Sequence, residues 1–494
     1  MTWRGRYWGV RSRKAGAEQP SSTAQHTYLT CAGDCWKRAG SSRQSSGSLP
    51  GKSPSSILTL NPYRSRPRRD CDGGILKPNR RVTVAGGAIT PFIGKFHPDF
   101  IWKKHPDFGT KENPSLEQLL HRVVLGACED VGIDAAIVDR GYVGNFVGEL
   151  FCQQGHLGAL AVAADTGFLY TPFTRIEGAC ASGGLAIAAG VDAIQAGAEV
   201  VLVSGVEVQS TQNAKVGADF LARAAHYQKE RSIDPFTFPA MFARRTEAYC
   251  HKHDVVPEAL APIVAKAYCN ANRNPNAHMH SVTVTQQQAA EASDANPCFL
   301  DNESLNPWLK LSDCSQVSDG ACAVILCSDE GLARLGQGAD RAVEIQACSV
   351  ACGPLGEVAD FARMDVTEAA AGVAYSSAGW NANDIEVAEV HDCFSISEAL
   401  MCEALGFCNE GEGTQLAADG ATSLEGRIPV NTGGGLMAFG HPVGATGVKQ
   451  VYELFRQLNG LCGDYQLASS PRRGICANMG GDDRTSVVTL LEKK

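Results

Sequence analysis

Hydrophobic and polar residues alternate along residues 81–210 with spacings that switch between strand-like and helix-like. The run at 185–196 places its apolar residues on one helical face and stops at Gly197, which predicts a helix. The same patterns predict strands at 81–87 (ending in a glycine turn), 142–149, 174–177 and 199–208, and helices at 116–131 and from 159 to 164. Strands that alternate with helices predict an α/β fold with helices on both faces of a sheet.

Residues 211–310 are more polar and irregular, and we expect an insertion that covers part of the fold. Regular patterns return after it, with strands at 320–327, 342–350, 385–390 and 486–491 and helices at 366–378, 395–405 and 448–458. Ser395 and Glu398 have the spacing of a helix capping box. The chain therefore divides into two similarly ordered halves, 81–335 and 340–494, without an exact sequence repeat.

The first 80 residues differ in charge from the rest. They carry 15 Lys and Arg residues against four acidic residues, a net of +11, whereas residues 81–494 carry a net of −20. An Arg-rich, Ser-rich and acid-poor segment is typical of mitochondrial targeting, so we predict a mitochondrial location. The alternative is that this segment is a disordered basic arm and that the protein is peroxisomal, glycosomal or cytoplasmic. The C-terminus does not match the Ser-Lys-Leu peroxisomal targeting signal.

Composition excludes several classes of protein. A chain of 494 residues that is 44% hydrophobic and 20% charged is neither disordered throughout nor a small disulfide-stapled module. The net negative charge of residues 81–494 argues against nucleic-acid binding. The sequence contains no uninterrupted apolar run of about 18 residues, so we predict no membrane span. Nineteen cysteines without a secretory signal indicate reduced thiols in an intracellular compartment.

Cys180 is the first candidate for chemistry. It lies in Gly-Ala-Cys-Ala-Ser-Gly-Gly at 178–184, between a predicted strand and a predicted helix. A helix N-terminus stabilises a thiolate through its free N–H groups, so we expect a lowered pKa for this thiol. The alternative is a buried structural cysteine.

His391 and Cys393 form the second candidate, in His-Asp-Cys-Phe at 391–394 directly after a predicted strand. Open α/β sheets bind ligands at the carboxyl ends of their strands. A histidine two residues from a cysteine suits acid–base chemistry, and an inert loop pair is the alternative.

His441 is the third candidate, fixed by Pro442 in a glycine-dense loop over 431–447 that precedes a helix. The loop contains neither a P-loop nor a GxGxxG motif, so it does not match a nucleotide-binding signature. Its glycines would still let a ligand approach the backbone closely.

Two other features are weaker. Cys476 stands in a run of small residues, 476–481, which predicts a turn before the last strand, and a structural thiol is favoured there. The His-x-His pairs at 251 and 253 and at 278 and 280 lack a third ligand at a convincing spacing, so we predict no metal site.

Together these stretches resemble the thiolase family. Cys-Ala-Ser-Gly at 180–183 resembles the nucleophile motif, and Gly-His-Pro at 440–442 with Gly-Ala-Thr-Gly at 444–447 resembles the catalytic GHP loop. His-Asp-Cys-Phe replaces the usual Asn-Glu-Ala-Phe, which resembles the sterol-carrier-protein-type thiolases, including those of trypanosomatids. The usual terminal Cys-x-Gly motif is not matched at Cys476, so Cys393 is the expected second catalytic thiol. We expect no appended sterol-carrier domain.

The resemblance implies two βαβαβαββ halves in a five-layered α/β/α/β/α fold, with a loop domain at 211–310. It implies 3-ketoacyl-CoA thiolysis and the reverse Claisen condensation, with Cys180 as nucleophile and His441 as its base. His391 and His441 would stabilise the enolate oxygen, and Cys393 would move the proton. Coenzyme A would be a co-substrate, with acyl-CoA as the other substrate and no bound cofactor or metal. The family forms homodimers or homotetramers.

Two other functions remain open at this stage. A ketoacyl-synthase-type condensing enzyme has the same fold class and also uses one cysteine and two histidines, but it has no need of a second thiol. A non-catalytic, thiolase-like acyl-CoA binding protein is the other alternative.

Overall fold

The computed structural model describes residues 80–494. The basic segment and its expected targeting role therefore lie outside the described residues, apart from Arg80. This arginine donates hydrogen bonds to the carbonyl oxygens of Ile194 and Ala198 at 2.7 and 3.0 Å. Its guanidinium also lies 2.6 Å from the Glu199 carboxylate, so the described chain is anchored from its first residue.

The first half of the chain follows the predicted alternation. Its elements are β1 (Thr83–Ile89), α1 (Leu116–Val131), β2 (Arg140–Gly144), α2 (Gly148–Phe151), α3 (Leu157–Val162), β3 (Phe173–Ile176), α4 (Ser182–Gln195), β4 (Val200–Glu207), β5 (Gly320–Cys327) and α10 (Asp329–Leu332). The strands lie in the order β1-β5-β4-β2-β3. Strands β4 and β5 are buried along their whole length, which explains their unbroken apolar sequences.

The second half repeats this arrangement. Its elements are β6 (Val343–Cys352), α11 (Asp365–Ala378), β7 (Val387–Glu389), α12 (Ser395–Ala404), α13 (Gly413–Ala418), α14 (Thr446–Leu458), β8 (Arg473–Gly480) and β9 (Thr485–Glu492). The strand order is β6-β9-β8-β7, and Val430 pairs in parallel with Ala388 of β7 on the side away from β8. The two halves therefore share one strand order, and a short pairing of β1 with β6 joins them into a nine-stranded sheet.

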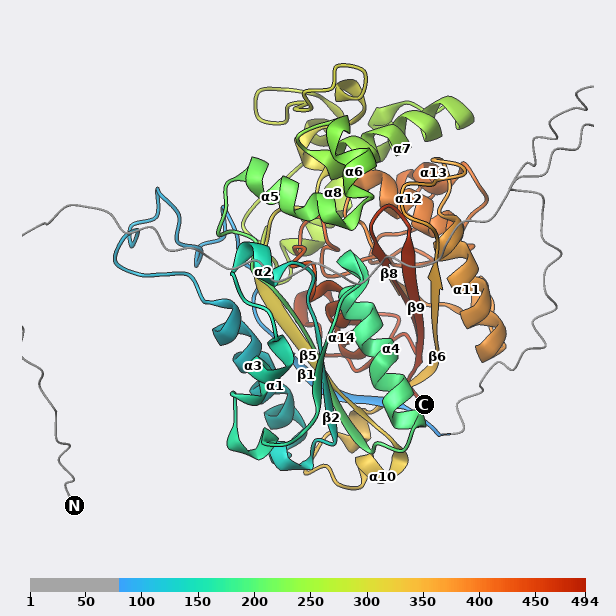
Figure 1. The fold of residues 1–494 in the computed structure, drawn as a ribbon. Coiled ribbons are helices and arrows are strands. Elements are labelled where there is room, and N and C mark those ends of the chain that lie inside the picture. The colour runs from blue at the N-terminus through green and yellow to red at the C-terminus, as the bar shows by residue number, and fades with distance from the viewer. Residues whose placement is uncertain (1–79) are drawn as a thin grey trace, which may run out of the picture. The chain divides into compact units, whose positions relative to one another are not determined.

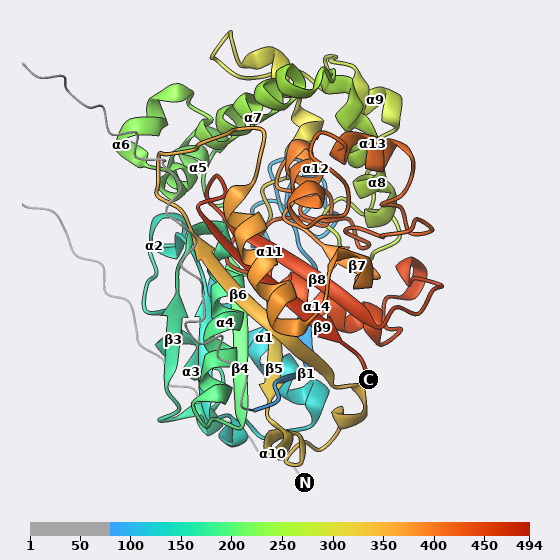
Figure 2. The ribbon, with the colours of Figure 1, turned by 90° about the vertical axis from the view of Figure 1, so that its right-hand side faces the viewer.

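Helices and strands stack in five layers, which Figure 1 shows from left to right. Helices α1 and α3 cover the outer face of the first half, and α11 covers the outer face of the second. Helices α4 and α14 contact each other and strands of both halves, so they form the middle layer. Figure 2 shows the same arrangement from the side, with α11 in front of β6, β8 and β9. The predicted α/β class is confirmed.

The polar segment between β4 and β5 is more regular than its sequence indicates. It contains α5 (Ala214–Leu221), α6 (Tyr227–Glu230), α7 (Thr237–His253), α8 (Ala261–Ala271) and α9 (Gln286–Ala290), which lie above the layers in Figure 1. Helices α7 and α8 bury residues such as Phe242, Tyr249 and Ile263 against the second half. Among residues 80–494, no helix has the length and apolar character needed to cross a membrane.

The predicted turn at Gly86 and Gly87 is wrong, because both residues lie within β1. A side chain at Gly87 would place its Cβ 2.3 Å from the carbonyl oxygen of Ala323 on β5. The pairing register also shifts between Val84 and Gly86. These glycines therefore permit close strand packing and a β-bulge rather than a turn.

The predicted capping box at the start of α12 is also wrong. Phe394 occupies the N-cap position and makes no side-chain cap. The Ser395 hydroxyl donates to the Asp313 carboxylate at 2.9 Å, and the buried Glu398 forms an ion pair with Lys266. Both polar side chains are therefore used in contacts with the inserted segment, which local spacing does not encode.

Candidate active site

Cys180 lies where the sequence places it, in a short 3-10 turn (Ala179–Ala181) that leads into α4. Ala179 takes a left-handed conformation with φ of 55°, which bends the chain into the helix. The thiol is half-buried and packs against an apolar cluster that includes Phe146 and Val443. The turn thus presents the sulfur at the N-terminal end of a central helix.

The expected lowering of the Cys180 pKa is wrong. Burial raises the pKa of this thiol to about 12, although the backbone N–H of Gly481 acts in the opposite direction. The nearby Glu207 carboxylate raises it further. Desolvation therefore outweighs the hydrogen bonds to sulfur, and Cys180 rests as a neutral thiol that would need a base to act as a nucleophile.

His441 supplies a suitable base. Its Nδ1 lies 2.7 Å from the hydroxyl oxygen of Thr446, and that hydroxyl donates its own hydrogen to the carbonyl oxygen of Pro442 at 3.1 Å. With the hydroxyl hydrogen directed at Pro442, Nδ1 of His441 carries the proton and Nε2 is a hydrogen-bond acceptor. Burial, with a smaller effect of Lys449, lowers the pKa of His441 to about 3, so the ring is neutral.

In His391 the two ring nitrogens have the opposite hydrogen-bonding roles. It follows β7, is completely buried, and its Nδ1 lies 3.0 Å from the amide nitrogen of Asn478. The amide nitrogen is a donor only, so Nδ1 accepts and Nε2 carries the proton. This Nε2 is buried and has no hydrogen-bond partner. Burial and the neighbouring His441 hold the pKa of His391 well below its usual value.

The structure brings Cys180, His391 and His441 together. The two imidazole rings lie 5.1 Å apart at 89°. The sulfur of Cys180 and one ring nitrogen of each histidine all lie within 4.8 Å of one another. Among residues 80–494, this is the one place where three potential metal ligands approach so closely, and neither His-x-His pair takes part in it.

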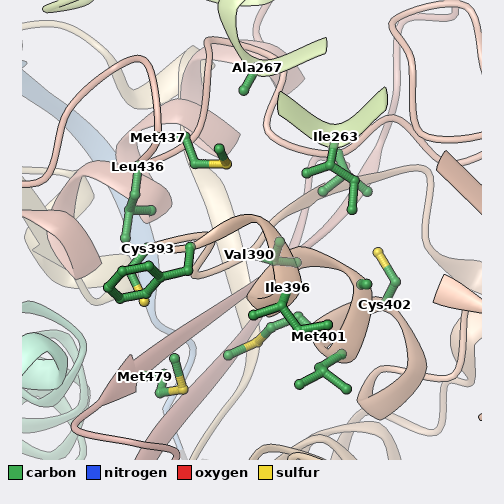
Figure 3. Close-up of a cluster of buried hydrophobic side chains, with 14 of the residues drawn as sticks. Ile263, Ala267, Val390, Cys393, Ile396, Met401, Cys402, Leu436, Met437 and Met479 are labelled. Atoms are coloured by element: carbon green, nitrogen blue, oxygen red, sulfur yellow. The ribbon is translucent and has the colours of Figure 1, made fainter. Parts of the chain in front are cut away.

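Cys393 lies beside this cluster in an apolar environment. Figure 3 shows it among buried side chains that include Leu436 and Met479. Its sulfur is 3.8 Å from the hydroxyl oxygen of Ser397. Burial raises the pKa of Cys393 well above its usual value, and the Cys180 thiol adds to the effect. Two thiols, both protonated at rest, therefore face one small site.

Cys476 is not part of the site. The predicted turn at 476–481 is wrong, since β8 extends to Gly480, and Cys476 points toward Thr489 on the adjacent strand. The functional residue in this run is instead Asn478, which sequence reasoning missed. Its only signal was a polar residue among small ones.

Glu207 connects the loops around the site. At the end of β4, its buried carboxylate accepts hydrogen bonds from the backbone N–H groups of Phe146, Val147 and Gly444 at 2.9–3.2 Å. The side-chain amide of Asn145 donates a fourth at 2.9 Å. One carboxylate therefore fixes the loop after β2 of the first half to the loop before α14 of the second.

A surface groove adjoins the apolar cluster around Cys180. Its lining residues are the apolar Phe146, Val147 and Leu150 and the charged Glu149, Arg175, Glu177 and Arg223. Glu149 and Arg175 form an ion pair there. The three apolar residues pack in the same cluster as Cys180, so the groove lies close to this thiol.

Comparison with protein families decides the class. The thiolase N-terminal domain model matches residues 105–330, and the thiolase C-terminal domain-like model matches residues 350–493. The chain belongs to the thiolase family. The layered architecture is accordingly the thiolase fold, and the protein is an acyltransferase of thiolase type.

Named relatives support this thiolase assignment. Acetyl-CoA acetyltransferase of Methanothermobacter thermautotrophicus is 35% identical over 382 residues, which cover 77% of this chain and 95% of the relative. Benzoylsuccinyl-CoA thiolase subunit BbsB of Thauera aromatica is 28% identical, with 83% and 97% covered. Sterol carrier protein 2 of Homo sapiens is 31% identical, with 69% and 61% covered. A solved Ltp2-ChsH2(DUF35) aldolase chain shares the fold alone, with a TM-score of 0.65, 21% identity, and 84% and 98% covered.

Proposed function

We propose that this thiolase catalyses CoA-dependent cleavage of 3-ketoacyl-CoA and the reverse Claisen condensation. One observation carries the proposal: a ring nitrogen of His441 and one of His391 lie within 4.8 Å of the Cys180 sulfur, and the contacts at their Nδ1 atoms make Nε2 of His441 an acceptor and Nε2 of His391 a donor. Acyl transfer to sulfur requires this combination, because the nucleophile must lose a proton while negative charge develops on a nearby oxygen.

In the first step, His441 Nε2 takes the Cys180 proton and the sulfur attacks the 3-keto carbon. The C2–C3 bond then breaks, and its electron pair passes into the enolate of acetyl-CoA. The N–H of His391 hydrogen-bonds to the enolate oxygen. Removal of one such donor typically costs about 10²–10³ in rate.

Cys393 supplies the proton that the enolate carbon needs, and acetyl-CoA leaves. Incoming CoA then gives its thiol proton to the Cys393 thiolate while its sulfur attacks the acyl-Cys180 thioester. The Cys180 thiolate departs and recovers its proton from His441. Every proton returns to its starting group. Because acetyl-CoA leaves before CoA attacks the acyl-enzyme, the kinetics are ping-pong, and CoA is the only co-substrate.

In this proposal the acyl group lies along the groove close to Cys180. Phe146, Val147 and Leu150 give the groove an apolar lining and pack in the same cluster as Cys180. These apolar residues support the proposal that the enzyme accepts acyl chains longer than acetyl. The His-Asp-Cys-Phe motif at 391–394 and the similarity to sterol carrier protein 2 support a sterol-carrier-type specificity.

The test is thiolysis of acetoacetyl-CoA and of a longer 3-ketoacyl-CoA by the wild type, Cys180→Ala and Cys393→Ala, with Cys476→Ala as a matched control. We expect both site variants to lose activity by at least about 10²-fold, because each removes a reacting group. The Cys476→Ala variant should keep activity, since this thiol lies within β8.

Other outcomes would separate the alternatives. An unimpaired Cys393→Ala variant would assign the proton transfer to another group. A wild type that needs a malonyl donor would favour the synthase, and one that binds CoA esters without turnover would favour the binding protein. A mitochondrial location, from the basic residues 1–80, and a homodimeric or homotetrameric state, from the family resemblance, complete the proposal.

A further inference from the structure

Asn478 is a buried polar residue with three contacts that all point into the site. It lies on β8, and its side chain is only 1% exposed. Its Oδ1 accepts the backbone N–H of Gly184 at 3.0 Å, and its Nδ2 donates to the carbonyl oxygen of Cys180 at 3.2 Å. Its Nδ2 also donates to Nδ1 of His391 at 3.0 Å.

The first two contacts fix which way the amide faces. A backbone N–H is a donor only and a carbonyl oxygen is an acceptor only, so a flipped amide would oppose donor to donor and acceptor to acceptor. Space for this amide is reserved by glycines: a Cβ at Gly184 would lie 2.7 Å from Oδ1, and a Cβ at Gly447 would lie 2.3 Å from it. His391 therefore always meets an N–H donor at Nδ1.

We infer that Asn478 is a positioning residue that fixes the proton of His391 on Nε2. This makes His391 a hydrogen-bond donor toward the reacting oxygen, and this part of the inference rests on the proposed function. The same contact prevents His391 from binding a metal ion through Nε2. This second part of the inference does not depend on the proposed function. An imidazole that binds a metal through Nε2 must carry its proton on Nδ1 and donate it to an acceptor, and Asn478 offers none.

The second consequence is specific to this site. Cys180, His391 and His441 bring a thiol and two imidazoles within 4.8 Å, a donor set that suits zinc or cobalt. Asn478 keeps His391, one of the three potential ligands, in the tautomer whose Nε2 carries a proton and therefore cannot bind a metal ion. A site built for acyl transfer is in this way protected from capture by a soft divalent cation.

The decisive variants are Asn478→Asp and Asn478→Ala in the full chain. The Asn478→Asp carboxylate accepts a proton from Nδ1 of His391 and so reverses the tautomer, whereas Asn478→Ala only releases it. We expect kcat for acetoacetyl-CoA thiolysis to fall about 10²-fold or more in Asn478→Asp and roughly tenfold in Asn478→Ala, with KM nearly unchanged in both. A merely structural role would make the isosteric Asp the better tolerated of the two.

Cobalt binding provides the independent readout. Titration with Co²⁺, followed by the thiolate-to-cobalt absorption band, should show at least about tenfold tighter binding to Asn478→Asp than to the wild type. Adding Cys180→Ala to that variant should remove the band. Equal kcat loss in the two Asn478 variants, or unchanged Co²⁺ affinity, would overturn the inference.

Two further outcomes are assigned in advance. If Asn478→Asp does not fold, as judged by circular dichroism, Asn478→Ala decides: an unchanged kcat overturns the inference, and a tenfold loss at constant KM supports it. If the wild type cleaves no 3-ketoacyl-CoA, the proposed function fails, and the Co²⁺ comparison still tests the tautomer.

Discussion

Burial favours the neutral forms of two residues in the candidate site. It raises the pKa of Cys180 to about 12 and lowers that of His441 to about 3, which favours a neutral thiol and a neutral imidazole over a thiolate–imidazolium pair. In the proposed mechanism, the proton moves when a substrate carbonyl is in place to receive the sulfur. A neutral thiol of this kind resists chance alkylation and oxidation, which act on the thiolate.

This predicts how Cys180 should respond to pH. Below its pKa, the thiolate fraction of a simple thiol rises tenfold per pH unit, so inactivation by iodoacetamide should climb about tenfold per unit from pH 7 to 10 without a plateau. Mass spectrometry of the Cys180 peptide distinguishes this thiol from the other cysteines. A plateau below pH 8 would instead reveal a stable ion pair and contradict the neutral site.

The catalytic candidates were accessible from sequence because Cys180 and His391 follow strands, and Cys180 and His441 stand among glycines. Cys180, His391 and His441 indeed converge, as the positions of their motifs predict. The Cys180 pKa and the role of Asn478 were not accessible. Both depend on burial and on contacts between segments almost 300 residues apart, which local pattern does not contain.

At the level of elements, the approach of α4 to α14 shapes the site. The two central helices meet where both carry glycine: a Cβ at Gly183 would lie 2.8 Å from the backbone nitrogen of Gly447 and 2.9 Å from the carbonyl oxygen of Gly444. Backbone atoms cannot move aside as side chains do. The contact therefore brings the loops that carry Cys180 and His441 to one point.

A pair of glycine substitutions tests this contact. Gly183→Ala should lower the free energy of unfolding by about 1–3 kcal/mol and reduce activity, because the new methyl group overpacks the crossing. Gly372→Ala is the control, since it lies in α11 with open space around it and should raise stability by about 0.5–1 kcal/mol. Urea unfolding of both variants gives the comparison, and equal effects would refute the close-packing role.

Elements with a clear period were predicted within a few residues, including α1, β4, β5 and α14. The failures share a cause. β8 contains small residues that resemble a turn, yet pairing with β7 and β9 on both sides makes it a central strand. Helix α7 has a polar sequence because it covers the second half with one face only.

The whole molecule behaves as one unit because contacts cross between its halves. Glu207 of the first half accepts a hydrogen bond from Gly444 of the second, and the Tyr452 hydroxyl of α14 donates to the carbonyl oxygen of Gly87 at 2.9 Å. Helix α14 also packs on β5. The halves also share a hydrophobic cluster, in which Val203 of the first half packs together with Val387 and Leu491 of the second. We therefore expect residues 80–494 to unfold in a single transition.

Glu207→Gln tests this coupling. An amide offers one acceptor oxygen to four donors and turns its own N–H₂ toward some of them, so the free energy of unfolding should fall by about 1–3 kcal/mol. Surface-exposed Glu330→Gln is the control and should change it by less than about 0.5 kcal/mol. Hydrogen exchange in β4 and β8 should accelerate together; acceleration in β4 alone would show that the halves unfold separately.

The repeated strand order has one more consequence. Asn145 follows β2 and bonds to Glu207 on β4, whereas His391 follows β7, the equivalent strand, and bonds to Asn478 on β8. The two pairs therefore occupy equivalent places in the two halves, one fixing loops and the other lying in the candidate site. The Asn145–Glu207 pair is then the natural place to build a second reactive centre into this chain.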